Sequence, residues 1–144
     1  MRKIAVFLFA LFLRGCVGEV YAQQSAADAV CGYYFVKDPF SKEGSQVKIY
    51  KAKDGTYEGV VCWVENPAKK PYLGYKFLKG FTYNSSEQEW QNGSIHHPGT
   101  GKTYKSYIKL NGTDQIKVRG YVGFSALGMT MNWKRESKQR KQEE

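Results

Sequence analysis

The chain has 144 residues, of which 42% are hydrophobic and 15% aromatic, and it carries 22 basic against 13 acidic side chains. This composition is typical of one globular domain, and it excludes a polytopic membrane protein, a collagen-like repeat and a disordered low-complexity chain. The length also excludes the large barrels and two-lobed enzymes.

The first 22 residues have the pattern of an export signal. Two basic residues and an apolar run, residues 4–13, precede Val20-Tyr21-Ala22, a small-x-small cleavage site before Gln23. A run of ten apolar residues is about half of what a bilayer span requires, so we expect cleavage and a periplasmic or secreted domain. The alternative is a lipid anchor at Cys16, because residues 13–16 resemble a bacterial lipoprotein box.

A short helical turn is expected at residues 25–30, and beyond it apolar residues recur with a period of two. Tyr104, Ile108 and Leu110 fall on one face, for example, while Lys105 and Lys109 fall on the other. This alternation predicts half-buried strands. The expected strands are residues 31–37, 46–51, 57–64, 75–82, 89–95, 104–110, 115–119 and 129–133.

Short connections decide how these strands are joined. Residues 53–55 and 111–114 are turn sequences, because Gly and Asn tolerate the positive φ of tight hairpins. Parallel strands need crossovers of about a dozen residues or more, which are absent here. We therefore expect an all-β domain over residues 23–135, an eight-stranded antiparallel up-and-down barrel, with a two-sheet β-sandwich as the alternative. Residues 136–144 are expected to form a mobile charged tail.

Three ordered motifs carry a family resemblance. They are residues 71–74 (PYLG), residues 90–98 running into Gly101-Lys102-Thr103-Tyr104, and residues 119–128 followed by Thr130 and Trp133. Over about residues 30–135 the chain resembles the bacterial domain of unknown function family 2147. The resemblance implies an exported envelope protein with a lipocalin-like (calycin) barrel and no established activity. It also implies that Gly32-Tyr33-Tyr34 stands where the wider barrel superfamily carries a Gly-x-Trp motif.

The sequence offers little for catalysis. His96 and His97 are the only histidines, and as strand neighbours they point to opposite faces, so we expect no metal site and place His97 on the loop surface. Residues 99–103 imitate a phosphate loop but lack its first Gly and its following helix. We expect no catalytic residues and no cofactor, with an uncharacterised hydrolase as the alternative. We also expect no nucleic-acid partner, because the lysines are spread singly along the chain.

The interior of an eight-stranded barrel holds either side chains alone or one small ligand. A small hydrophobic or amphipathic ligand, bound as by a carrier or sensor, is the leading hypothesis. The alternative is an envelope module that binds an anionic polymer or a partner protein through its basic outer face. Arg119 belongs outside by alternation, but a bulge at Gly120 would turn it inward to hold an anionic head group. The expected ligand-binding residues are Val47, Ile49, Trp63, Tyr104, Ser106, Ile108, Ile116, Val118, Arg119 and Tyr121.

Export would place Cys31 and Cys62 in an oxidising compartment, which favours a disulfide. The meander separates them, however, because they lie on the first and third strands. Two strand spacings come to about 9.6 Å, beyond the roughly 7 Å that a disulfide bridges between Cα atoms. We therefore expect two free, largely buried thiols.

Overall fold

The computed structural model describes residues 26–124 and 126–143, so the leader and Cys16 lie outside the described residues. Each of the eight expected strands is present. The predicted turn before the first strand is also found, as the 3-10 helix η1 (Asp28–Val30). The strands are β1 (Gly32–Lys37), β2 (Gly44–Lys51), β3 (Tyr57–Val64), β4 (Lys76–Asn84), β5 (Glu89–His96), β6 (Thr103–Asn111), β7 (Gln115–Tyr121) and β8 (Gly128–Glu136).

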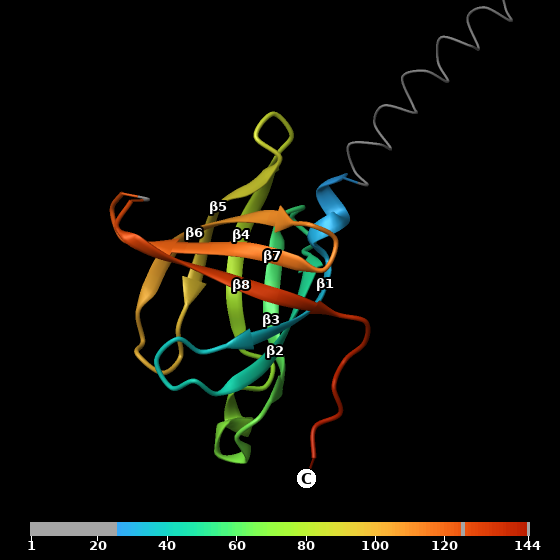
Figure 1. Cartoon of the computed structure of the whole chain (residues 1–144), viewed down its shortest axis with the longest axis vertical. Coiled ribbons are helices and arrows are strands. Elements are labelled where there is room, and N and C mark those ends of the chain that lie inside the picture. Colours follow the sequence, from blue (N-terminus) through green and yellow to red (C-terminus); the bar gives the residue numbers. More distant parts are fainter. Residues whose placement is uncertain (1–25, 125, 144) are drawn as a thin grey trace, which may run out of the picture.

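The strands form a closed antiparallel barrel in which every strand pairs with its neighbours in sequence (Figure 1). The last strand returns to the first, with Tyr33 opposite Glu136 and Phe35 opposite Lys134. The up-and-down barrel is thereby confirmed, and the sandwich alternative is wrong. Closure leaves no free sheet edge, which is the physical advantage expected for a meander of this length.

An up-and-down meander places alternate connections at opposite ends of the barrel. The β2–β3, β4–β5 and β6–β7 turns lie at one end, together with η1, and we call this the closed end. The opposite, open end carries the β1–β2, β5–β6 and β7–β8 connections and the β3–β4 connection, which contains the 3-10 helix η2 (Pro67–Tyr72).

Arg135 fastens the segment around η1 to the closed end. Its guanidinium donates to the carbonyl oxygens of Ala29 (2.7 Å) and Cys31 (3.0 Å) and lies 5.1 Å from the centre of the Tyr34 ring. The Tyr34 hydroxyl donates to the Val30 carbonyl at 2.8 Å, and burial raises the pKa of Tyr34 to about 12. The Gly32-Tyr33-Tyr34 motif thus supplies a buried aromatic at the start of the first strand.

Large side chains fill the half of the barrel next to the closed end. Trp90 and Trp133 are almost completely buried, and the Phe81 ring occupies the space where a side chain on Gly93 would lie. Such tight packing fills the barrel interior in this half. The other members of this core are Val30, Tyr34, Ile49, Tyr57, Leu78, Ile108, Ile116 and Val118.

The C-terminal segment packs against the barrel, where a mobile tail was expected. The Arg140 guanidinium lies 4.8 Å from the Phe35 ring centre and 4.7 Å from that of Trp63, and it pairs with Glu136 at 2.8 Å. The side chain of Gln142 donates to the carbonyl of Val64 and accepts from its amide. These contacts give the charged segment aromatic and backbone partners that alternation patterns do not reveal.

Cys31 and Cys62 are both free, as expected, although each is half-buried rather than fully buried. Cys62 sits in a β-bulge, because Gln46 pairs with Trp63 whereas the next residue, Val47, pairs with Val61. The Cys62 thiol donates to the side-chain oxygen of Gln46 at 3.2 Å, and burial raises the pKa of this thiol.

Candidate functional site

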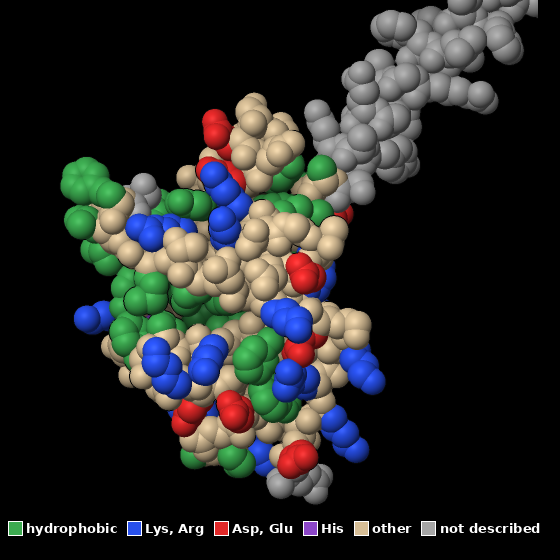
Figure 2. All heavy atoms as spheres, in the orientation of Figure 1, with side chains coloured by type: hydrophobic (Ala, Val, Ile, Leu, Met, Phe, Trp, Pro, Cys, Tyr) green, Lys and Arg blue, Asp and Glu red, His purple; other side chains and the backbone are tan. Residues whose placement is uncertain are grey.

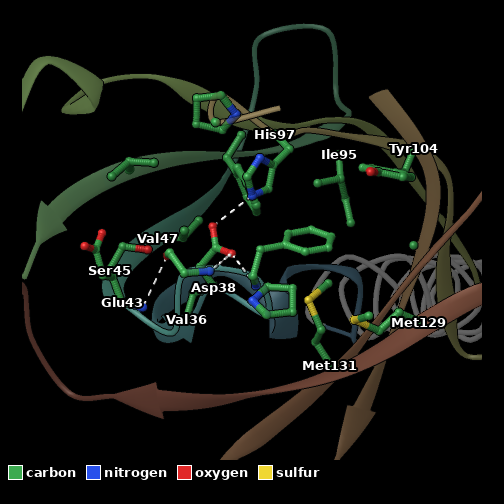
Figure 3. Close-up of a pocket in the computed structure, with 18 of the residues that line it drawn as sticks. Val36, Asp38, Glu43, Ser45, Val47, Ile95, His97, Tyr104, Met129 and Met131 are labelled. Atoms are coloured by element: carbon green, nitrogen blue, oxygen red, sulfur yellow. Dashed lines mark hydrogen bonds and ion pairs between the residues drawn. The ribbon is translucent and has the colours of Figure 1, made fainter. Parts of the chain in front are cut away.

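The half of the barrel next to the open end contains a cavity of about 310 Å³ (Figure 3). Small inward residues explain its presence here. Val36, Val47 and Val61 face inward on β1, β2 and β3, and Gly120 on β7 has no side chain. The barrel is therefore solid at the closed end and hollow at the open end, because its largest fully buried side chains, Trp90, Trp133, Tyr34 and Phe81, lie in the closed half.

The floor and the far wall of the cavity are also apolar. Phe77 on β4 contacts the cavity, and its ring packs on that of the buried Trp133 at a centroid distance of 6.0 Å. Ile95, Tyr104 and Met131 complete the wall from β5, β6 and β8. A cavity lined in this way favours an apolar molecule or the apolar part of an amphipathic one.

A hydrogen bond between Asp38 and His97 joins the β1–β2 and β5–β6 connections at the mouth of the cavity. The Asp38 carboxylate and His97 Nε2 lie 2.8 Å apart, and His97 Nδ1 accepts from the Thr100 amide at 3.1 Å. Because Nδ1 accepts, Nε2 is the nitrogen that carries the proton and donates to Asp38. Both ring nitrogens of His97 are thus engaged in holding loops.

Asp38 also accepts hydrogen bonds from the backbone amides of Phe40 (2.7 Å) and Ser41 (3.2 Å). Burial acts to raise the pKa of Asp38, but these amides and His97 outweigh it and hold the pKa below its usual value. The carboxylate is therefore ionised at neutral pH and fixes the β1–β2 connection.

A second polar link crosses the rim at Glu43. Its carboxylate forms an ion pair with Lys69 of η2 at 2.6 Å and accepts from the Asn66 side chain at 2.8 Å. The hydrogen bond from Lys69 lowers the pKa of Glu43. Three of the four connections at the open end are therefore tied together by polar side chains, which preorganises the mouth of the cavity.

The structure divides the expected ligand-binding residues into three groups. Val47 and Tyr104 line the cavity, and Tyr121 borders its mouth while its ring packs against Tyr107 at a centroid distance of 6.3 Å. A second group points inward but belongs to the buried interior and does not line the cavity. These residues are Ile49, Ser106, Ile108, Ile116 and Val118.

Trp63 and Arg119 do not line the cavity, and both expectations are corrected. The bulge at Cys62 shifts the alternation of β3, so the Trp63 ring lies under Arg140 and the C-terminal segment. β7 pairs with β6 without a shift of register at Gly120. Arg119 consequently stays on the side predicted by plain alternation, where its guanidinium donates to Thr130 Oγ1 at 3.0 Å.

His97 was expected on the loop surface, but its side chain is only 12% exposed and lines the cavity. His96 lies between the hydroxyls of Ser94 (3.1 Å) and Thr103 (3.0 Å). Asp38 and His97 could not be paired from the sequence, because they are 59 positions apart and sit in two loops without periodicity. Phe77 lines the cavity but was not among the expected ligand-binding residues, although it lies within the strand predicted at residues 75–82.

Two further findings concern only residues 26–124 and 126–143. Within these ranges no three His, Cys, Asp or Glu side chains are grouped so that they could hold a metal ion. The same ranges contain no helix with the length and apolar character needed to cross a membrane.

Comparisons with known proteins agree with this architecture. A solved structure of the protein HP1028 from Helicobacter pylori, described as belonging to the lipocalin family, is similar to this chain with a TM-score of 0.59. The sequences are 17% identical, and the match covers 75% of this chain and 83% of that one, so the likeness concerns the fold. No curated protein matches the chain. The family model described as "Uncharacterized protein conserved in bacteria (DUF2147)" matches residues 32–135, and the chain therefore belongs to this bacterial family.

Proposed function

We propose that this protein binds one small lipophilic or amphipathic molecule in the open half of its barrel, as an exported carrier or sensor. The observation that supports this most directly is the apolar cavity of about 310 Å³, which falls at the lower end of the roughly 300–1,000 Å³ typical of ligand pockets. The solid closed half limits how deep a ligand reaches, since the ring of Phe77 rests on Trp133.

The distribution of polarity favours an amphipathic ligand with its apolar part inside. The walls are apolar, whereas the charged side chains Asp38, Glu43 and Lys69 belong to the connections at the mouth. A ligand in this orientation places its polar end near water and its apolar end against Phe77. An interior polar end would lack the charged partners that a buried charge requires.

A fluorescent fatty-acid probe tests the proposal. We expect stoichiometric binding with little response to salt, because burial of apolar surface drives it. A tryptophan at Val61 narrows the cavity, so Val61→Trp should weaken probe binding at least about tenfold. The matched control is Val60→Trp on the same strand, because Val60 does not line the cavity.

Met131→Trp provides a second variant in case Val61→Trp perturbs folding, since Met131 also faces the cavity from a different strand. Equal probe affinity in the parent chain and in a folded Met131→Trp variant contradicts the proposal. Binding of an anionic polymer that weakens steeply with salt, with no binding of any apolar probe, would instead favour the interaction module.

A further inference from the structure

Large apolar side chains project from the β7–β8 connection and the start of β8 at the open end. Phe124 is 76% exposed, Leu127 66%, Val122 63% and Met129 46%. Phe40, on the β1–β2 connection, is 62% exposed and contacts the His97 ring edge-on. We call these five residues the rim patch, and Figure 2 shows apolar side chains projecting where Figure 1 places the β7–β8 connection.

The rim patch is held in place and continuous with the cavity. The Val122 amide donates to the Leu127 carbonyl at 3.2 Å, and the Leu127 amide donates to the Phe124 carbonyl at 2.9 Å. Val122, Leu127, Met129 and Phe40 also contribute to the cavity lining, whereas Phe124 does not. An apolar path therefore leads from the outer surface into the barrel, and exposed patches of this kind mark sites of interaction.

The charges at the open end are unbalanced. Lys37, Lys42, Lys70, Lys102 and Lys105 lie at or near its loops, and within the described part of the chain none of them has a carboxylate within ion-pair distance.

The acidic groups at the same end are already engaged. Asp38 binds His97, Glu43 binds Lys69, and the Glu65 carboxylate accepts from the Gly44 amide at 2.7 Å. The open end therefore carries more lysines than carboxylates, and the mouth of the cavity presents apolar side chains within this net positive charge.

We infer that the open end docks on the surface of an anionic lipid bilayer, with the rim patch inserted among the head groups. Apolar side chains flanked by Lys fit such a surface, because insertion buries the side chains while the ammonium groups attract anionic lipids. The cavity then opens directly onto the bilayer, so a lipophilic ligand passes between membrane and barrel without crossing water. This inference rests on the proposed function for its purpose, but its test is independent of it.

Sedimentation with vesicles of phosphatidylglycerol and phosphatidylcholine in equal parts tests the docking. The parent chain should bind these vesicles, and bind vesicles of phosphatidylcholine alone more weakly, with an affinity that falls as salt rises. Phe124→Asp should lower the partition coefficient at least about tenfold, since it removes the most exposed apolar side chain and adds a negative charge.

The matched control is Leu110→Ser, which removes an apolar side chain that is 44% exposed at the opposite end of the barrel and should leave vesicle binding unchanged. All the proteins carry the same N-terminus, so any contribution of residues 1–25 cancels in the comparison. Phe124→Asp should keep the urea midpoint of the parent chain, followed by the fluorescence of the buried Trp90 and Trp133, which shows that the variant is folded.

Equal sedimentation of Phe124→Asp and the parent chain overturns the inference. Failure of the parent chain to bind anionic vesicles also overturns the inference. The same holds if the rim patch binds a soluble protein and no vesicles. Neither result bears on the proposed function, which fails separately if the probe does not bind in solution.

Discussion

Replacing Arg135 with Met tests whether the closed end depends on one side chain. Methionine keeps the apolar length of arginine but loses the hydrogen bonds to the carbonyls of Ala29 and Cys31 and the contact with the Tyr34 ring. A hydrogen bond from a charged group contributes about 1.5–3 kcal/mol. The cation–π contact contributes about 0.5–2 kcal/mol.

These contributions overlap, and the freed carbonyls regain some water, so we expect the free energy of unfolding to fall by about 3 kcal/mol. This corresponds to a rise of about a hundredfold in the unfolded fraction. Urea denaturation followed by tryptophan fluorescence measures it, because Trp90 and Trp133 are buried in the core. The midpoint should shift while the slope of the transition stays the same.

The adjacent residue on β8 supplies the control. Lys134 is exposed, and Lys134→Met should change the free energy of unfolding by less than about 0.5 kcal/mol. A loss below about 1 kcal/mol for Arg135→Met would refute the role given to the Arg135 contacts. The segment around η1 would then be held by its other contacts, such as the hydrogen bonds from Tyr34 to the Val30 carbonyl and from Trp90 to the Ala27 carbonyl.

Four further predictions follow from the leader, the thiols and the titrating groups. N-terminal sequencing of the exported protein should begin at Gln23, whereas a lipid-blocked terminus would refute cleavage there. Thiol labelling of the mature protein, unfolded without reductant, should modify both Cys31 and Cys62, and no labelling would reveal a disulfide. The pKa of Asp38 lies below its unfolded value of about 3.9, so its stabilisation is present above that value and lost as pH falls through the folded pKa. Asp38→Asn should therefore cost about 1 kcal/mol near neutral pH and less in acid, measured by urea midpoints across the pH range, and a cost independent of pH would contradict this. The pKa of Tyr34 is raised to about 12, so its neutral form stabilises the fold below its unfolded pKa of about 10, and this stability is lost as pH rises toward 12. An absorbance titration checks this, because Tyr34→Phe should lose part of the tyrosinate absorbance that the parent chain gains as pH rises toward 12. If Tyr34→Phe loses none of that absorbance, Tyr34 titrates normally.

The sequence by itself determined the strands and their order. Alternation such as Ile116-Lys117-Val118 marks each half-buried strand, and connections too short for a crossover force neighbouring strands to run antiparallel. Eight such strands close because closure satisfies the backbone groups of the first and the last. The free thiols followed from the same order, since Cys31 and Cys62 lie two strands apart.

Only the tertiary structure decided where the barrel is hollow and what surrounds its mouth. Alternation identifies which residues face inward. Whether their side chains fill the interior or leave a cavity depends on how all eight strands contribute to one volume. Trp90, Trp133 and Phe81 converge in one half and leave the valines of the other half facing a cavity. The sequence pattern also does not reveal the bulge at Cys62 or the pairing of Asp38 with His97. A bulge depends on the register of the partner strand, and a hydrogen bond between loops 59 residues apart depends on the closed barrel that brings them together.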